Sequence, residues 1–190
     1  MRGRIPVQAR SRRVLRPVLR PRPRLIPVVV GTHPERNHWL QDCIKSIRAT
    51  TRNRRVHIHR HGGYEITALR AGINKYRRFL FLHDSCEILD PEFWEHIDST
   101  PPAWLYGAPH MYLGVFDSDQ LAHAIRDAPE HMDKQASINW EGELGTRLQM
   151  PTLWPEVTDA NSQFAERHGR TNRVLGNHLA RKFKGNWGQT

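Results

Sequence analysis

A group of acidic residues follows an apolar segment near the middle of the chain. Phe79–Leu82 is continuously apolar, and Asp84 and Glu87 come shortly after it. Hard divalent cations such as Mg²⁺ and Mn²⁺ prefer oxygen ligands, and a nucleoside diphosphate can supply the ligands that the protein does not. Asp84 and Glu87 are therefore candidate metal ligands. The alternative is that Asp84 caps a turn while Glu87 is solvated.

Three histidines form a second pattern. His57, His59 and His61 occupy alternate positions of an apolar-polar segment, so on a strand all three point to one face. Zinc sites use such clusters, but the spacing ties no cysteine or fourth ligand to this one. A half-exposed polar face is therefore the preferred interpretation. His61, at the end of the segment, is the histidine expected near a ligand.

The elements that must position these residues alternate along the first half of the chain. The patterns predict strands and helices in the order Leu25–Val30 (strand), Glu35–Thr50 (helix), Val56–His59 (strand), Ile66–Tyr76 (helix) and Phe79–Leu82 (strand). This order predicts an α/β fold with a doubly wound, mostly parallel sheet and helices on both faces, in the Rossmann-like manner. Ligands of such sheets bind beyond the carboxyl ends of the strands, which here carry Thr32, His61 and Asp84.

The second half is less regular. Residues 103–108 and 112–116 are expected to form strands, and Asp117 or Ser118 is expected to cap a helix. The segments Trp140–Leu148 and Val174–Phe183 are both predicted to be helical.

The charge of the chain is concentrated at its start. The formal net charge is +10, and residues 1–24 carry nine arginines, several prolines and no acid. Residues 25–190 carry 20 basic and 19 acidic residues, so we expect a near-neutral domain preceded by a cationic, flexible arm. The arm could be a disordered tail, a tether to polyanions or anionic membrane surfaces, or an organelle-targeting peptide.

Two further features concern the compartment. No apolar run approaches the roughly 20 residues of a transmembrane helix. The two cysteines, Cys43 and Cys86, lie within apolar patterns, which argues against a disulfide scaffold and favours a reducing, cytoplasmic compartment.

The loop after the first predicted strand excludes two common nucleotide-binding classes. Gly31–Pro34 has neither the GxGxxG pattern of dinucleotide-binding enzymes nor the GK[ST] ending of a P-loop. The chain instead resembles family 2 glycosyltransferases over about residues 25–150. Four segments carry the resemblance in the family's order: Ile26–Arg36 with Leu40–Ile47, Gly62–Gly63 with Ala68–Ile73, Phe81–Pro91, and Trp140–Leu148.

The resemblance implies a glycosyltransferase A-type fold, a nucleotide-diphosphate sugar donor and an Mg²⁺ or Mn²⁺ ion. It places Thr32, Glu35 and Asp84 near the nucleotide sugar, and we add His61 from its position at the strand end. Asp84 and Glu87 would hold the metal, and late basic residues such as His168 and Arg170 would return over the metal and the diphosphate. Glu141 would be the catalytic base that takes the proton of the acceptor hydroxyl. The resemblance also implies inversion of the anomeric centre, as in most of the family.

Three positions depart from the family pattern. Ser85 and Gly142 stand where the family has aspartates, and Arg60–His61 replaces a further aspartate at the end of the second strand. The acceptor could be a protein, a glycan, a lipid-linked sugar or modified DNA. The alternative function is a catalytically inactive transferase-like fold that binds nucleic acid or another polyanion through its arm.

Overall fold

The computed structural model describes residues 25–61, 64–106, 113–154 and 171–185. The arm (residues 1–24), His168 and Arg170 lie outside the described residues. The helices are α1 (Asn37–Thr50), α2 (Tyr64–Ile73), α3 (Glu92–Ser99), α4 (Ser118–Ala124) and α5 (Lys134–Leu148). The strands are β1 (Val28–Thr32), β2 (Val56–Arg60), β3 (Arg78–His83), β4 (Cys86–Ile88), β5 (Ala103–Tyr106), β6 (Gly114–Asp117), β7 (Thr152–Trp154), β8 (Thr171–Gly176) and β9 (Ala180–Gly185).

Six strands form the main sheet, in the order β2-β1-β3-β6-β5-β7. The pairs β1–β2, β1–β3 and β5–β7 are parallel, and β6 runs antiparallel to both of its neighbours, β3 and β5. The predicted α/β fold with a mostly parallel sheet is therefore confirmed. The carboxyl ends of β1, β2 and β3 meet at one edge of this sheet, as parallel pairing requires.

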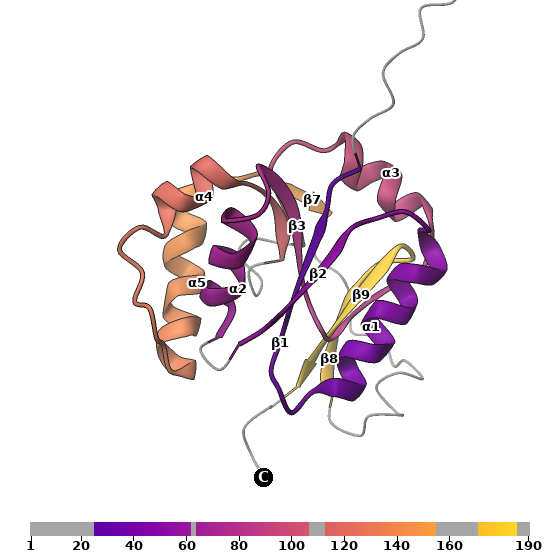
Figure 1. Ribbon diagram of the computed structural model, residues 1–190, viewed down its shortest axis with the longest axis horizontal. Coiled ribbons are helices and arrows are strands. Elements are labelled where there is room, and N and C mark those ends of the chain that lie inside the picture. Colours follow the sequence, from indigo (N-terminus) through magenta and orange to yellow (C-terminus); the bar gives the residue numbers. More distant parts are fainter. Residues whose placement is uncertain (1–24, 62–63, 107–112, 155–170, 186–190) are drawn as a thin grey trace, which may run out of the picture.

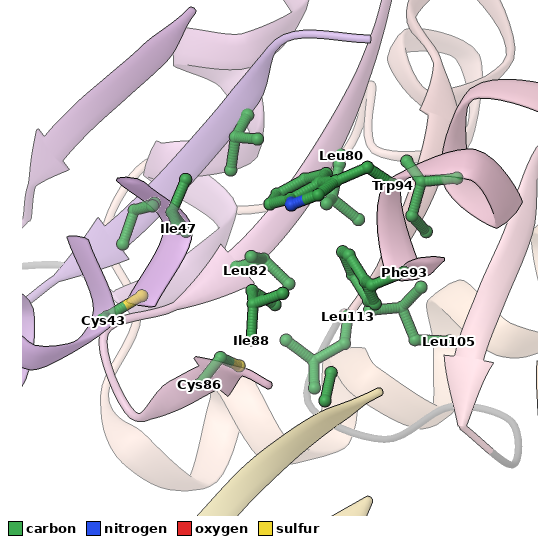
Figure 2. Packing of buried hydrophobic residues seen from close by; sticks show 14 of the residues in the cluster. Cys43, Ile47, Leu80, Leu82, Cys86, Ile88, Phe93, Trp94, Leu105 and Leu113 are labelled. Carbon is green, nitrogen blue, oxygen red and sulfur yellow. The ribbon is translucent and has the colours of Figure 1, made fainter. Parts of the chain in front are cut away.

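Helices cover both faces of the sheet, with α1 and α3 on one side and α2, α4 and α5 on the other (Figure 1). Each face of the sheet has its own hydrophobic core, and alternate residues of a strand point into one core or the other. Leu80 and Leu82 of β3 pack under α1 and α3, while Phe79 and Phe81 pack under α2. Figure 2 shows the first core, in which Phe93 and Trp94 of α3 approach Leu80. Continuous burial on both faces explains why Phe79–Leu82 of β3 is apolar at every position.

Glycines allow α2 to lie close to the sheet. A Cβ atom at Gly31 of β1 would lie 3.0 Å from the Phe81 ring and 3.3 Å from Ala68 of α2. A Cβ atom at Gly72 of α2 would lie 2.5 Å from the Phe79 ring. Larger residues at these two positions would push α2 off the sheet and displace its first turn from the strand ends.

A second, antiparallel sheet has the order β4-β9-β8 and was not expected from the sequence. The predicted helix over Val174–Phe183 is wrong, because β8 and β9 form a hairpin there. Asn177 makes the turn: its Oδ1 accepts hydrogen bonds from the backbone N–H groups of Leu179 and Ala180. Gly176 (φ +157°) leaves no room for a side chain, since a Cβ atom would lie 2.3 Å from the Ala180 carbonyl oxygen.

The predicted helix in the region of residues 140–148 is present but begins earlier. α5 starts at Lys134, where Asp133 caps it by accepting a hydrogen bond from the Ala136 N–H at 2.7 Å. The early turns have few apolar residues, so the periodicity signal begins only at Trp140. The expected cap at the start of α4 is confirmed, with Asp117 accepting from two backbone N–H groups. In the described part of the chain, no helix combines the length and apolar character needed to cross a membrane.

Candidate functional site

The carboxyl edge of β1 and β3 brings Thr32, Arg36 and Asp84 together. Asp84 follows β3 and is only 1% exposed, and its backbone N–H donates to the Gly31 carbonyl at 3.1 Å. Thr32 Oγ1 donates to Asp84 Oδ2 at 2.8 Å, and Arg36 Nη1 lies 3.7 Å from Asp84 Oδ1. The Arg36 side chain is 27% exposed, so its guanidinium lies next to the buried Asp84 carboxylate and is also accessible from the surface.

The first turn of α1 adds donors to this edge. α1 begins at Asn37, directly after Arg36, and has neither a side-chain cap nor an acidic residue in its first turn. The first N–H groups of a helix carry a partial positive charge and lack partners within the helix. Together with Arg36, this end of α1 favours an anionic ligand.

A second buried carboxylate lies beside the first. Glu65, in the first turn of α2, has Oε1 3.5 Å from His83 Nδ1 and accepts a hydrogen bond at Oε2 from Ser137 Oγ of α5 at 3.0 Å. Burial raises the pKa of Glu65 above its ordinary value, while the bond from Ser137 opposes that shift. Both oxygens of Glu65 are therefore engaged, and α2, α5 and the end of β3 are tied together.

A buried lysine comes to the same edge from the far end of the chain. Lys182 of β9 is 1% exposed, and its Nζ donates a hydrogen bond to Ser85 Oγ in the turn after β3. Burial lowers the pKa of Lys182, and its interactions with Cys86, Asp84 and, to a smaller extent, Glu65 oppose that effect. An ammonium group is costly to bury without such counter-charges.

His57 and His59 of β2 and His61, directly after the strand, lie along one face, as expected. The rings of His57 and His59 are 6.5 Å apart and those of His59 and His61 are 6.4 Å apart. Desolvation, followed by the charges of nearby His59, His33 and Arg36, lowers the pKa of His61 to about 4. His61 is therefore neutral at pH 7 and can offer the site a hydrogen bond but no charge. Its backbone N–H donates to the Thr32 carbonyl at 3.0 Å.

The structure does not bring Glu87 to the side of Asp84. Cys86 and Ile88 of β4 are buried, so Glu87, between them, points to the opposite face of the strand. There it lies opposite Arg181 in the β4–β9 register. Within the described residues no group of three or more His, Cys, Asp or Glu side chains is placed to hold a metal ion. The donor set of Asp84, with Thr32 and Arg36, does not fit a divalent cation, which needs several oxygen ligands.

The remaining predicted site residues lie further out. Glu141 is half-buried on the inward face of α5, one turn after Ser137, and it is not at the start of that helix. Glu143 is on the outer face, where it pairs with Arg147 at 3.0 Å, as expected. Glu35 is 89% exposed and lies 4.0 Å from His33 Nδ1.

Sequence reasoning missed four residues of this edge as site candidates: Arg36, Glu65, His83 and Lys182. Arg36 and His83 adjoin the predicted strand ends and could have been found from that position. Glu65 and Lys182 carry no local signal, since each lies among ordinary surface-like residues in the sequence. Only the packing of α2 and of the β8–β9 hairpin brings them to the edge.

Comparison with known proteins adds no relative: no family model matches the chain, and no curated protein or solved structure matches it at a significant level.

Proposed function

We propose that this chain is a glycosyltransferase that uses a nucleotide-diphosphate sugar as donor. The observation that carries the proposal is the convergence of Thr32, Arg36 and Asp84 at the carboxyl ends of β1 and β3, beside the uncapped start of α1. A parallel sheet binds ligands at that edge, and the partly exposed Arg36 guanidinium there suits a diphosphate. The motif resemblance to family 2 glycosyltransferases supplies the donor class, and the Rossmann-like α/β fold is compatible with it.

The donor is bound by a small number of groups. Arg36 and the first N–H groups of α1 contact the diphosphate. Asp84 positions the Arg36 side chain through their ion pair and accepts a hydrogen bond from the Thr32 hydroxyl. Neutral His61 offers a hydrogen bond to the ribose or base. Glu65, whose two oxygens are held by His83 and Ser137, fixes α5 against the sheet.

The reaction is a single displacement at the anomeric carbon. The acceptor hydroxyl oxygen forms a bond to that carbon as the bond to the diphosphate oxygen breaks, and the nucleoside diphosphate leaves with the electron pair. The hydroxyl proton passes to Glu141, which lies on the inward face of α5. General-base catalysis of this kind contributes about 10²–10⁴-fold.

Thermal unfolding in the presence of UDP, GDP and dTDP tests donor binding, followed by a hydrolysis screen with the corresponding sugar nucleotides. A ligand that binds the folded state at 100 times its Kd stabilises it by about 2.7 kcal/mol. We expect one nucleotide to raise the unfolding temperature, and Arg36→Met to abolish the rise. Lys45→Met, which removes an exposed charge from the middle of α1, is the matched control and should keep it. If no nucleotide stabilises the protein, with or without Mn²⁺, the proposal is wrong.

A further inference from the structure

The buried cation of this edge comes from the last described strand. Lys182 lies opposite Cys86 in the β4–β9 register, so the two side chains share one face. That face is turned toward the Asp84–Ser85 turn, where the Lys182 ammonium reaches Ser85 Oγ. Arg181, its neighbour on β9, lies opposite Glu87 on the other face. The strand thus separates two cations, one facing the site and one facing away from it.

The charges of the edge explain why a buried cation is useful there. Asp84 and Arg36 alone form a neutral pair, in which the carboxylate offsets the guanidinium that should attract a phosphate. The charge of Lys182 also acts on Asp84. Lys182 offsets the charge of Asp84, so Arg36 keeps more of its attraction for an anion at the surface. The nearby Glu65 carboxyl, whose pKa burial raises, is engaged by His83 and Ser137.

A divalent cation would be the other way to supply positive charge at a diphosphate. Of the two buried carboxylates described at this edge, Glu65 is already engaged by His83 and Ser137, and the other is Asp84. Glu87 lies on the opposite face of β4. The hydroxyl of Ser85, next to Asp84, is already engaged by Lys182. Ser85, which stands where the family that the sequence resembles has an aspartate, is thus bonded to an ammonium group.

We infer that Lys182 is the built-in counter-cation of Asp84 and takes the place of a divalent metal ion, so that this site binds nucleoside diphosphates without metal. This inference rests on the proposed function and concerns the same site. Because Lys182 is sealed from solvent, it acts through Asp84 and Ser85 and is a positioning residue. The group that contacts the diphosphate is Arg36.

Calorimetric titration of the full chain with UDP and with GDP, in EDTA and in MnCl₂, tests the inference. We expect binding in EDTA with an affinity that Mn²⁺ does not improve. Binding that requires Mn²⁺ overturns the inference and leaves the proposed function standing. Absence of binding under both conditions overturns both, so the two failures are distinguishable.

Variants then assign the effect to the charge. Lys182→Met keeps most of the side-chain volume and removes the ammonium, and we expect the affinity in EDTA to fall about tenfold or more. Arg181→Met removes the same charge from the adjacent position on the outer face and should leave the affinity unchanged. Lys182→Arg keeps the charge and should retain part of the binding, which a purely structural role does not predict.

Circular dichroism and the unfolding temperature establish that each variant is folded. A folded Lys182→Met protein that binds as wild type does in EDTA contradicts the inference. Where Lys182→Met does not fold, the comparison of EDTA with MnCl₂ on the wild-type chain decides the question without it.

Discussion

Two ion pairs in this protein have similar chemistry and opposite environments, and their comparison shows how far burial sets the stability that such a pair contributes. Arg54 Nη1 and Nη2 each donate to Asp98 at 2.7 Å, and their side chains are 1% and 10% exposed. Arg147 makes the corresponding two-bond contact with Asp127, but these side chains are 29% and 56% exposed. Asp98→Asn and Asp127→Asn therefore make the same chemical change at a buried and at an exposed pair.

The magnitude at the buried pair follows from its geometry. Two unit charges 2.7 Å apart attract by about 6 kcal/mol at an effective dielectric constant of about 20. The cost of desolvating both groups offsets part of this, but removal of one partner leaves the Arg54 charge buried and uncompensated. Arg54 also holds the Ile26 carbonyl at 2.7 Å and lies 4.2 Å from the centre of the Trp94 ring, so it cannot turn out to solvent easily. We expect Asp98→Asn to lower the free energy of unfolding by about 3–5 kcal/mol.

Urea unfolding followed by circular dichroism measures both variants against wild type. A loss of about 3–5 kcal/mol is a large share of the 5–15 kcal/mol that a domain typically has. Asp127→Asn should change the midpoint little, because solvent screens the exposed pair. Equal losses in the two variants, or a small loss at Asp98, would refute the argument that burial sets the value of these pairs. Since the pair anchors the amino end of β1, the folded Asp98→Asn protein should bind nucleotides as wild type does.

Glu65→Gln should become progressively more stable relative to wild type as pH rises above about 4.5. Burial raises the pKa of Glu65 in the folded state above its ordinary value, so the unfolded wild-type chain ionises first and wild type loses stability. Urea unfolding at pH 4 and pH 7 measures this, and Glu35→Gln, which makes the same change at an exposed carboxylate, is the control. Glu141→Gln should lower turnover by at least about 10²-fold with donor affinity nearly unchanged; a comparable loss from Glu143→Gln with an active Glu141→Gln would reverse the assignment of the base. Deletion of residues 1–24 removes nine arginines and should weaken retention on heparin and its salt dependence while leaving the unfolding temperature nearly unchanged; a large fall in that temperature would show that the arm belongs to the fold.

Much of the doubly wound half can be predicted from the sequence, because its elements are specified locally. Apolar runs such as Phe79–Leu82 mark strands buried on both faces, and the helical stripe from Trp39 to Ile47 marks α1. The edge at which a ligand would bind then follows from the parallel order. Thr32 and Asp84 could be predicted as site residues for this reason, and in the structure Thr32 Oγ1 lies 2.8 Å from Asp84 Oδ2.

The second half could not be predicted in the same way, because its structure depends on contacts between distant segments. The β8–β9 segment contains apolar residues at spacings compatible with a helix, and only the Gly176–Asn177 turn argues for a hairpin. β4 is three residues long and takes its form from pairing with β9. Glu87 was expected beside Asp84 because the two are close in sequence, but the alternation of β4 sends it to the other face.

The small sheet thereby contributes to the candidate site as directly as the large one does. Asp84 lies at the edge because it directly follows β3. The Asp84–Ser85 turn continues into β4, whose partner strand β9 supplies Lys182. The register that sets Lys182 opposite Cys86 is what directs its ammonium toward Ser85. A shift of one residue would bring Arg181 to that face and send Lys182 to the other, since side chains alternate along a strand. The turn of the β8–β9 hairpin, made by Gly176 and Asn177, helps to hold that register, and so a turn far from Asp84 in the sequence determines which cation faces it.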